Sequence, residues 1–135
     1  ALAILMPIVA SMGGNAGTQT LTVAVRALAT RELTAANSMR IVGKEIVVGA
    51  LNGLLFALLV GLVAAWWFDA PTLGIVIAVA MVINMVVAGL AGTLIPLGLN
   101  RAGIDPAVAA TVFLTAVTDV VGFFVFLALA ALFLL

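Results

Sequence analysis

Charged residues divide this chain of 135 residues into four long apolar segments. Charge is absent from residues 1–25, 46–68 and 70–100, and the last segment contains only Asp119. A membrane-spanning helix needs about 20 predominantly apolar residues, so each segment is long enough to be one. The pattern predicts an all-α fold, a polytopic membrane helical bundle that forms a single transmembrane domain. Its four transmembrane helices are expected near residues 1–29, 40–68, 72–99 and 106–135.

Residues between the segments predict where helices begin and end. Asp105 precedes Pro106, and this pair favours a helix start because the carboxylate accepts a backbone N–H and proline suits the first turn. The stretch 69–72 similarly ends one helix and opens the next. Small residues recur every four positions in the second segment, which predicts a face for close helix packing, with a dimer interface as the alternative. These residues are Gly49, Gly53, Ala57 and Gly61.

The composition indicates that the predicted helices belong to an integral membrane protein. Hydrophobic residues make up 67% of it and charged residues 7%, with a mean hydropathy of +1.46, whereas a soluble domain carries roughly 25% charged residues. The net charge is zero, which indicates no nucleic-acid partner. Cysteine and histidine are both absent, so thiolate and imidazole metal sites are excluded.

The loop charges predict an orientation. Basic residues gather around the first and third loops, while the second loop carries only Asp69. The positive-inside rule therefore places loops 30–39 and 100–105 in the cytoplasm and both termini outside, in the plasma (inner) membrane. The chain opens on Ala1 directly in apolar sequence, so we expect a piece of a longer protein. If that protein starts in the cytoplasm, the predicted orientation requires one more helix before residue 1.

Asp119 is the residue most indicative of function. It lies about 20 Å into the last predicted helix at 1.5 Å per residue, where a carboxylate costs roughly 2.5–3.5 kcal/mol. No Lys or Arg lies at a comparable depth in any segment. Helical spacing predicts that Asp119 shares one side with four neighbours, which are Thr111, Thr115, Thr118 and Gly122. An ion or proton site is one interpretation, and a protonated carboxyl group that only ties helices together is the other.

A second polar group opens the chain. After Pro7 comes the run Gly13-Gly14-Asn15-Ala16-Gly17-Thr18-Gln19. Inside an apolar span such residues must face protein or water. Glycine permits either close helix approach or a locally opened backbone whose carbonyls point at a cation. The run lacks the Gly-Lys-Ser/Thr ending of a phosphate loop, so it does not indicate nucleotide binding.

The run from Pro7 to Gln19 resembles the signature of the MgtE-type magnesium transporters, and the stretch 88–124 is similar to the last two helices of that family. The resemblance implies a homodimer of five-helix membrane domains with the pore on the two-fold axis, of which this chain would be helices two to five. It also implies cytoplasmic regulatory domains that this chain does not contain. The family often has Asn or Gly and then Pro where Thr111 and Val112 stand here.

The resemblance further implies roles for residues. Asp119 would be the ion-binding carboxylate, Thr115 and Gly122 would offer backbone carbonyls, and Thr111 and Asn15 would lie close to a hydrated Mg²⁺. We expect the pore lining to include Gly13, Gly14, Gly17, Gln19 and Thr118.

The resulting hypothesis is a magnesium channel or transporter, not an enzyme. A cation- or proton-coupled secondary transporter and a structural membrane subunit without transport are the alternatives. An intramembrane aspartyl protease is excluded, because it needs two buried aspartates and only Asp119 is expected inside the membrane. Glu32, Glu45 and Asp105 are expected on the cytoplasmic side, where they are interpreted as solvated loop charges or as additional Mg²⁺ ligands.

Overall fold

A computed structural model describes residues 2–32 and 37–134, which form four long helices. The helices are α1 (Leu2–Ala29), α2 (Ser38–Trp67), α3 (Pro71–Arg101) and α4 (Pro106–Phe133). These bounds differ from the predicted ones by at most two residues at each end. Residues 1 and 135 and part of the predicted loop 30–39, namely 33–36, lie outside the described residues. The predicted all-α helical bundle is confirmed for the described chain.

Within the described part of the chain, three of the four helices are long and apolar enough to cross a membrane. They are α2 from Met39, α3 and α4. The remaining helix, α1, has 28 residues, which is also a spanning length, but its run of glycines and amides makes it less apolar. Its crossing of the membrane therefore stays a prediction.

Helix ends follow the chemistry of their residues. The carboxylate of Asp105 accepts a hydrogen bond from the backbone N–H of Ala107 at 3.0 Å, and Pro106 begins α4. This arrangement satisfies one of the backbone donors that a helix start leaves without a partner. At the other end of the bundle, Asp69 adopts a φ of +48° in the turn before Pro71, the first residue of α3. Both turns fall where the sequence predicts them.

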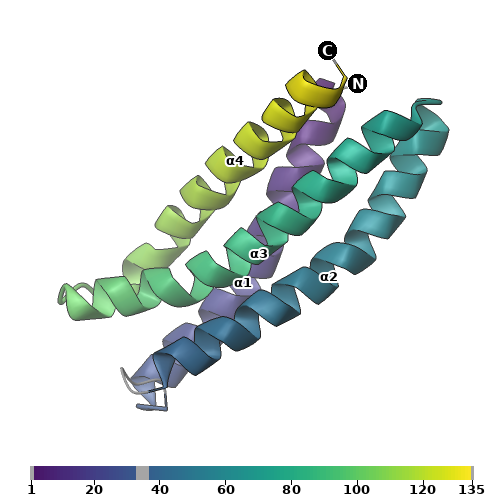
Figure 1. The fold of residues 1–135 in the computed structure, drawn as a ribbon. Helices are drawn as coiled ribbons and strands as arrows, with labels where there is room; N and C mark the ends of the chain where they lie inside the picture. The colour runs from purple at the N-terminus through teal and green to yellow at the C-terminus, as the bar shows by residue number, and fades with distance from the viewer. Residues whose placement is uncertain (1, 33–36, 135) are drawn as a thin grey trace.

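The helices pack around α3. The α2 helix packs mainly on α3, whereas α1 packs on both α3 and α4. Both chain ends lie at the same end of the bundle as the α2–α3 turn, and the other two connections lie at the opposite end (Figure 1). The basic residues are at that opposite end or close to it, as the loop analysis expects. They are Arg26, Arg31, Arg40, Lys44 and Arg101.

The core lies along α3. Ile77 and Met81 of α3 are fully buried together with Val9 of α1 and Phe126 of α4. Large apolar side chains on the outer faces of α2 and α4, such as Leu62, remain exposed in the single chain. Such a surface is suited to lipid or to another membrane helix.

The small face of α2 packs on α3, as the sequence predicts. A Cβ atom added at Gly61 would lie 2.9 Å from the carbonyl oxygen of Gly74, and one at Gly49 would lie 2.8 Å from that of Met85. These distances leave no space for a side chain, so glycine allows the two helix backbones to touch. In the other direction, a Cβ at Gly89 of α3 would meet the carbonyl oxygen of Glu45 at 2.8 Å. Helix packing is thus the use of this face.

Candidate functional site

Asp119 lies in the middle of α4. It follows Pro106 by 13 residues and is half-buried, so at 1.5 Å per residue it is about 20 Å from the start of the helix. The sequence of α4 contains no lysine or arginine. A carboxylate at this depth needs water, a cation or a proton to offset the loss of hydration.

The residues predicted to share one side with Asp119 divide into two groups. Thr111 and Thr115 are exposed, two helical turns and one helical turn before it, whereas Thr118 and Gly122 are buried. Their common place on a water-filled path stays a prediction, but in the single chain the last two are covered. The cause is that Thr118 and Gly122 lie on the neighbouring side of α4, which contacts α1 and α3.

The hydroxyl group of Thr118 bonds to its own helix. It donates to the carbonyl oxygens of Leu114 at 3.1 Å and Thr115 at 3.2 Å, an arrangement that satisfies a buried hydroxyl locally. Thr118 faces Gly14 of α1, where an added Cβ would lie 3.8 Å from the hydroxyl oxygen. Its predicted place on a pore stays a prediction, and in the single chain it belongs to the α1–α4 contact.

The glycine-rich run belongs to a continuous helix. Because α1 is helical from Leu2 to Ala29, close approach is the use of its glycines that the structure favours over an opened backbone. Gly13 faces α3 and Gly17 faces Leu114 of α4, and both are buried. They pack helices in this chain, and their predicted contribution to a pore lining stays a prediction.

The polar side chains of the same run point outward. Asn15 and Gln19 are exposed, and exposed Thr18 donates its hydroxyl hydrogen to the carbonyl oxygen of Gly14 at 2.8 Å. Asn15 directly follows Gly14, and Asp119 directly follows Thr118, so both candidates flank the same α1–α4 contact. The helices α1 and α4 therefore carry the predicted ion-site residues Asn15 and Asp119 next to the contact that they share.

Asn84 of α3 is a buried polar residue that the sequence analysis did not single out. Its side chain has no exposed surface, and its Nδ2 donates to the carbonyl oxygen of Val9 at 2.9 Å. The signal that would have found it is an amide in the middle of an uncharged span, where polar groups must face a partner. It lies against Gly13 and Gly122. Asn84 thus contacts both the glycine-rich run of α1 and the segment of α4 that contains Asp119.

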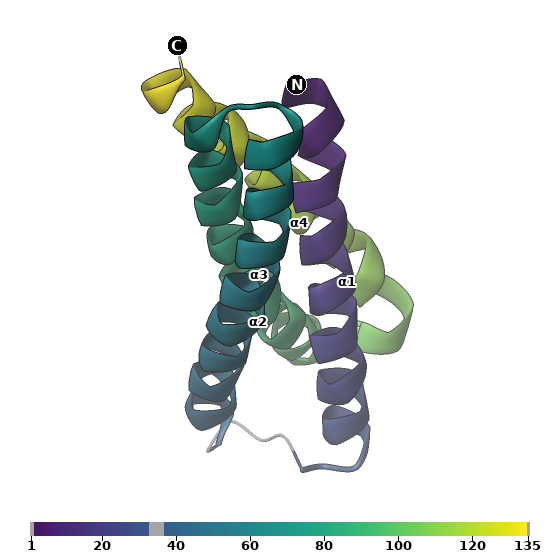
Figure 2. The same cartoon turned by 90° about the vertical axis from the view of Figure 1, so that its right-hand side faces the viewer.

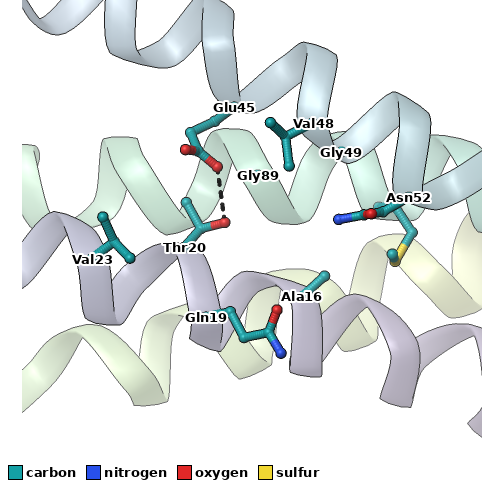
Figure 3. Close-up of a pocket in the computed structure, with 10 residues that line it drawn as sticks. Ala16, Gln19, Thr20, Val23, Glu45, Val48, Gly49, Asn52 and Gly89 are labelled. Carbon is teal, nitrogen blue, oxygen red and sulfur yellow. Dashed lines mark hydrogen bonds between the residues drawn. The ribbon is translucent and has the colours of Figure 1, made fainter.

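A separate pocket lies between α1, α2 and α3. It has a volume of about 180 Å³ and is lined by the half-buried Glu45, by Thr20 and by Asn52, among others. Figure 3 shows the Thr20 hydroxyl donating to Oε2 of Glu45 across the pocket, at 3.2 Å. The interpretation of Glu45 as a solvated loop charge is wrong, because the residue lies two turns inside α2. Asp119 is not among the residues that line this pocket.

The two other acidic candidates near the loops are exposed. Glu32 and Asp105 both have exposed side chains, and Asp105 uses its carboxylate to begin α4. Within residues 2–32 and 37–134, no three acidic side chains come close enough together to hold a metal ion.

Comparisons with known proteins agree with the resemblance in the sequence. The MgtE family, described as divalent cation transporters, matches residues 6–129. The magnesium transporter MgtE of Thermus thermophilus is 39% identical over 135 residues, which cover 99% of this chain and 30% of that protein. The one from Enterococcus faecalis is 36% identical over 133 residues, which cover 98% of this chain and 29% of that protein.

A third relative, the magnesium transporter MgtE of Bacillus subtilis, is 30% identical over 134 residues, which cover 99% of this chain and 30% of that protein. The chain spans about three tenths of the length of these curated relatives. The matched family is one of divalent cation transporters, not of enzymes. With nearly the whole chain matched by the family and by each relative, the chain belongs to the MgtE family of divalent cation transporters.

Proposed function

We propose that this chain is the pore domain of a magnesium channel that passes a largely hydrated Mg²⁺ past Asp119. The observation that carries the proposal is a half-buried carboxylate at the middle of α4, on a helix without a basic residue. The exposed Thr115 and Thr111 continue the polar stripe toward the start of α4. Support for magnesium comes from the three relatives, each of which is named a magnesium transporter.

The proposed assembly is a homodimer with Asp119 of each protomer on the two-fold axis. A two-fold contact brings the same residue of both copies together, so one aspartate per chain supplies two carboxylates to a shared ion. Mg²⁺ sheds water reluctantly and is usually held by one or two carboxylates together with several waters. Two charges attract a divalent ion without trapping it, as conduction requires.

Neighbouring groups would receive the waters of the ion. We assign this role to the backbone carbonyls of Thr115 and Gly122, to the Thr111 hydroxyl and to the Asn15 amide. Asn15, Thr111 and Thr115 are exposed in the single chain, which keeps them available to water and to a second copy. The greater length of the relatives leaves room for a cytoplasmic regulatory domain, and from the loop charges we propose that both termini of this chain lie outside.

The test is Mg²⁺ uptake by the natural full-length protein in liposomes. Asp119→Ala should lower the uptake about a hundredfold and Asp119→Asn somewhat less, because each change removes the charge that attracts the hydrated ion, at a cost of several kcal/mol. Asp69→Asn is the matched control, since Asp69 is exposed in the α2–α3 turn and asparagine tolerates its positive φ. Normal uptake by Asp119→Ala would refute the proposal.

A dependence on driving force separates the channel from the coupled transporter. Uptake through a channel should follow the Mg²⁺ gradient and the membrane potential, with no requirement for a pH gradient. Uptake by the wild type that stops when the pH gradient is collapsed would assign Asp119 to proton coupling and reject the channel.

A further inference from the structure

The amide of Asn84 occupies the space where α1, α3 and α4 meet. No part of its side chain is exposed. Its Nδ2 donates to the carbonyl oxygen of Val9 in α1 at 2.9 Å, a carbonyl that lies one turn before the Gly13-Gly14 pair. The side chain thereby links the central helix to the turn of α1 that leads into its glycine-rich run.

Two glycines leave the room that this amide fills. A Cβ added at Gly13 of α1 would overlap Nδ2 of Asn84, and one added at Gly122 of α4 would lie 2.9 Å from the same atom. Both distances are shorter than ordinary contacts, so the amide is held between α1 and α4 with no space to either side. The separation of these two helices is therefore set at this level by one side chain from a third helix.

The amide is not the side chain that would pack this space most favourably. Its Oδ1 is buried and has no hydrogen-bond partner among the described residues. A buried acceptor without a donor lowers stability, whereas an apolar side chain of similar volume carries no such penalty. Helix packing alone therefore does not account for an amide at this position.

The contact lies beside the candidate ion site. Gly122 follows Asp119 by three residues, so the two lie on adjacent turns of α4 about 4.5 Å apart along the helix axis. On α1, Gly13 is two residues before Asn15. A change in the Asn84 contact would shift the turns that carry Asp119 and Asn15 relative to each other.

We propose that Asn84 is a positioning residue that fixes the spacing of α1 and α4 beside Asp119, and thereby the size discrimination between Mg²⁺ and the larger Ca²⁺. The inference rests on the proposed function, since it assumes that an ion passes Asp119. Asn84 acts through Val9, Gly13 and Gly122, and it need not touch the ion. A hydrated ion held between two helices is sensitive to displacements well below the diameter of a water molecule.

The experiment compares three variants of the full-length protein in liposomes. Asn84→Leu keeps the approximate volume but removes the bond to Val9, and Asn84→Ala removes both. Thr93→Val is the matched control, because Thr93 is also fully buried on α3 but bonds only to the carbonyl of Gly89 in its own helix, at 3.1 Å. The readouts are the ratio of Mg²⁺ to Ca²⁺ uptake, the Mg²⁺ concentration at half-maximal uptake, and the Tm.

The expected result separates positioning from stability. In the folded Asn84 variants the Mg²⁺ to Ca²⁺ ratio should fall about tenfold whatever the change in Tm, and Thr93→Val should leave the ratio unchanged. If Asn84→Leu does not fold, the smaller Asn84→Ala must show the same loss of discrimination. The inference is overturned if the folded variants keep the wild-type ratio or change it no more than Thr93→Val does.

A parallel Asp119→Asn measurement distinguishes this inference from the proposed function. If Asp119→Asn transports Mg²⁺ normally, the proposed function fails and the inference fails with it. If Asp119→Asn loses uptake while the Asn84 variants keep the wild-type ratio, only the role of Asn84 is rejected.

Discussion

On its α1 side, the central helix α3 combines a close backbone contact, where a Cβ at Gly92 would lie 2.8 Å from the carbonyl oxygen of Gly17, with a buried amide, whereas on its α2 side it packs through close backbone contacts. Toward α2, backbone meets backbone, as where a Cβ at Gly61 would lie 2.9 Å from the carbonyl oxygen of Gly74. Toward α1 and α4, a buried amide from Asn84 stands between the helices and bonds to the carbonyl of Val9. In Figure 2 the α2–α3 pair and the α1 helix appear as neighbouring columns with α4 behind them.

The difference indicates which side is scaffold and which is functional. Contacts between glycine faces need no side-chain hydrogen bonds, so the shape of the helices fixes their geometry. Close packing of the backbones stabilises such contacts in lipid. A contact through a partly satisfied amide is less stable but ties its geometry to a specific bond. The ion-site candidates Asn15 and Asp119 lie on α1 and α4, the two helices that meet at the Asn84 amide. We therefore expect changes on the two sides of α3 to have different consequences.

The largest effect is expected from Gly13→Ala. The new Cβ would overlap Nδ2 of Asn84, which cannot retreat because Gly122 closes its other side. The free energy of unfolding should fall by about 1–3 kcal/mol, and Mg²⁺ uptake should fall about tenfold as α1 moves relative to α4. Unfolding in detergent micelles and uptake in liposomes measure the two quantities.

A double-mutant cycle shows whether this effect runs through the amide. Adding Asn84→Ala to Gly13→Ala removes the overlapping atoms, so the double variant should be more stable than Gly13→Ala alone. If Gly13→Ala is equally destabilising with Asn84 present or absent, the side chain is not what holds α1 at this distance.

An effect on stability without an effect on transport is expected from Gly61→Ala on the α2 side. Its Cβ would press on a backbone carbonyl, so the free energy of unfolding should fall by about 1–3 kcal/mol, while the Mg²⁺ concentration at half-maximal uptake stays the same. Gly43→Ala is the matched control on α2, since nothing lies within 4 Å of its added Cβ, and it should be neutral or stabilising. A changed Mg²⁺ to Ca²⁺ ratio in Gly61→Ala would remove the distinction between the two sides.

The sequence predicts the features that local patterns encode. Charge-free spans set the four helices, and Asp105 with Pro106 marks the start of α4, as found. The repeat that includes Gly49 and Gly61 identifies a packing face. Helical periodicity gives the face of a helix but not the helix that it meets, so the partner α3 comes only from the structure.

Two side chains show why the rest was not predictable. Asn84 bonds to a carbonyl 75 residues away, and no local pattern encodes a contact over that separation. Glu45 follows Lys44 near a loop, where its sequence context is that of a solvated charge, and its hydrogen bond with Thr20 of α1 comes only from the structure. Similarly, spacing along α4 does not separate Thr118 from Asp119, because which side is covered depends on where α1 lies.

The smallest effect is expected from Glu45→Gln, in the pocket between α1, α2 and α3. Glutamine still offers an acceptor to the Thr20 hydroxyl, which lies 3.2 Å from Oε2, so the stability should change by no more than about 0.5 kcal/mol and Mg²⁺ uptake should stay within about threefold of wild type. Thr20→Val removes the donor and tests the bond itself, with a loss of about 0.5–1.5 kcal/mol. This weak response is informative because Glu45, like Asp119, is a half-buried carboxylate on a long apolar helix. A loss of uptake as large as that of Asp119→Asn would mean that the ion also depends on this pocket, and the division between a scaffold side and a functional side of α3 would no longer hold.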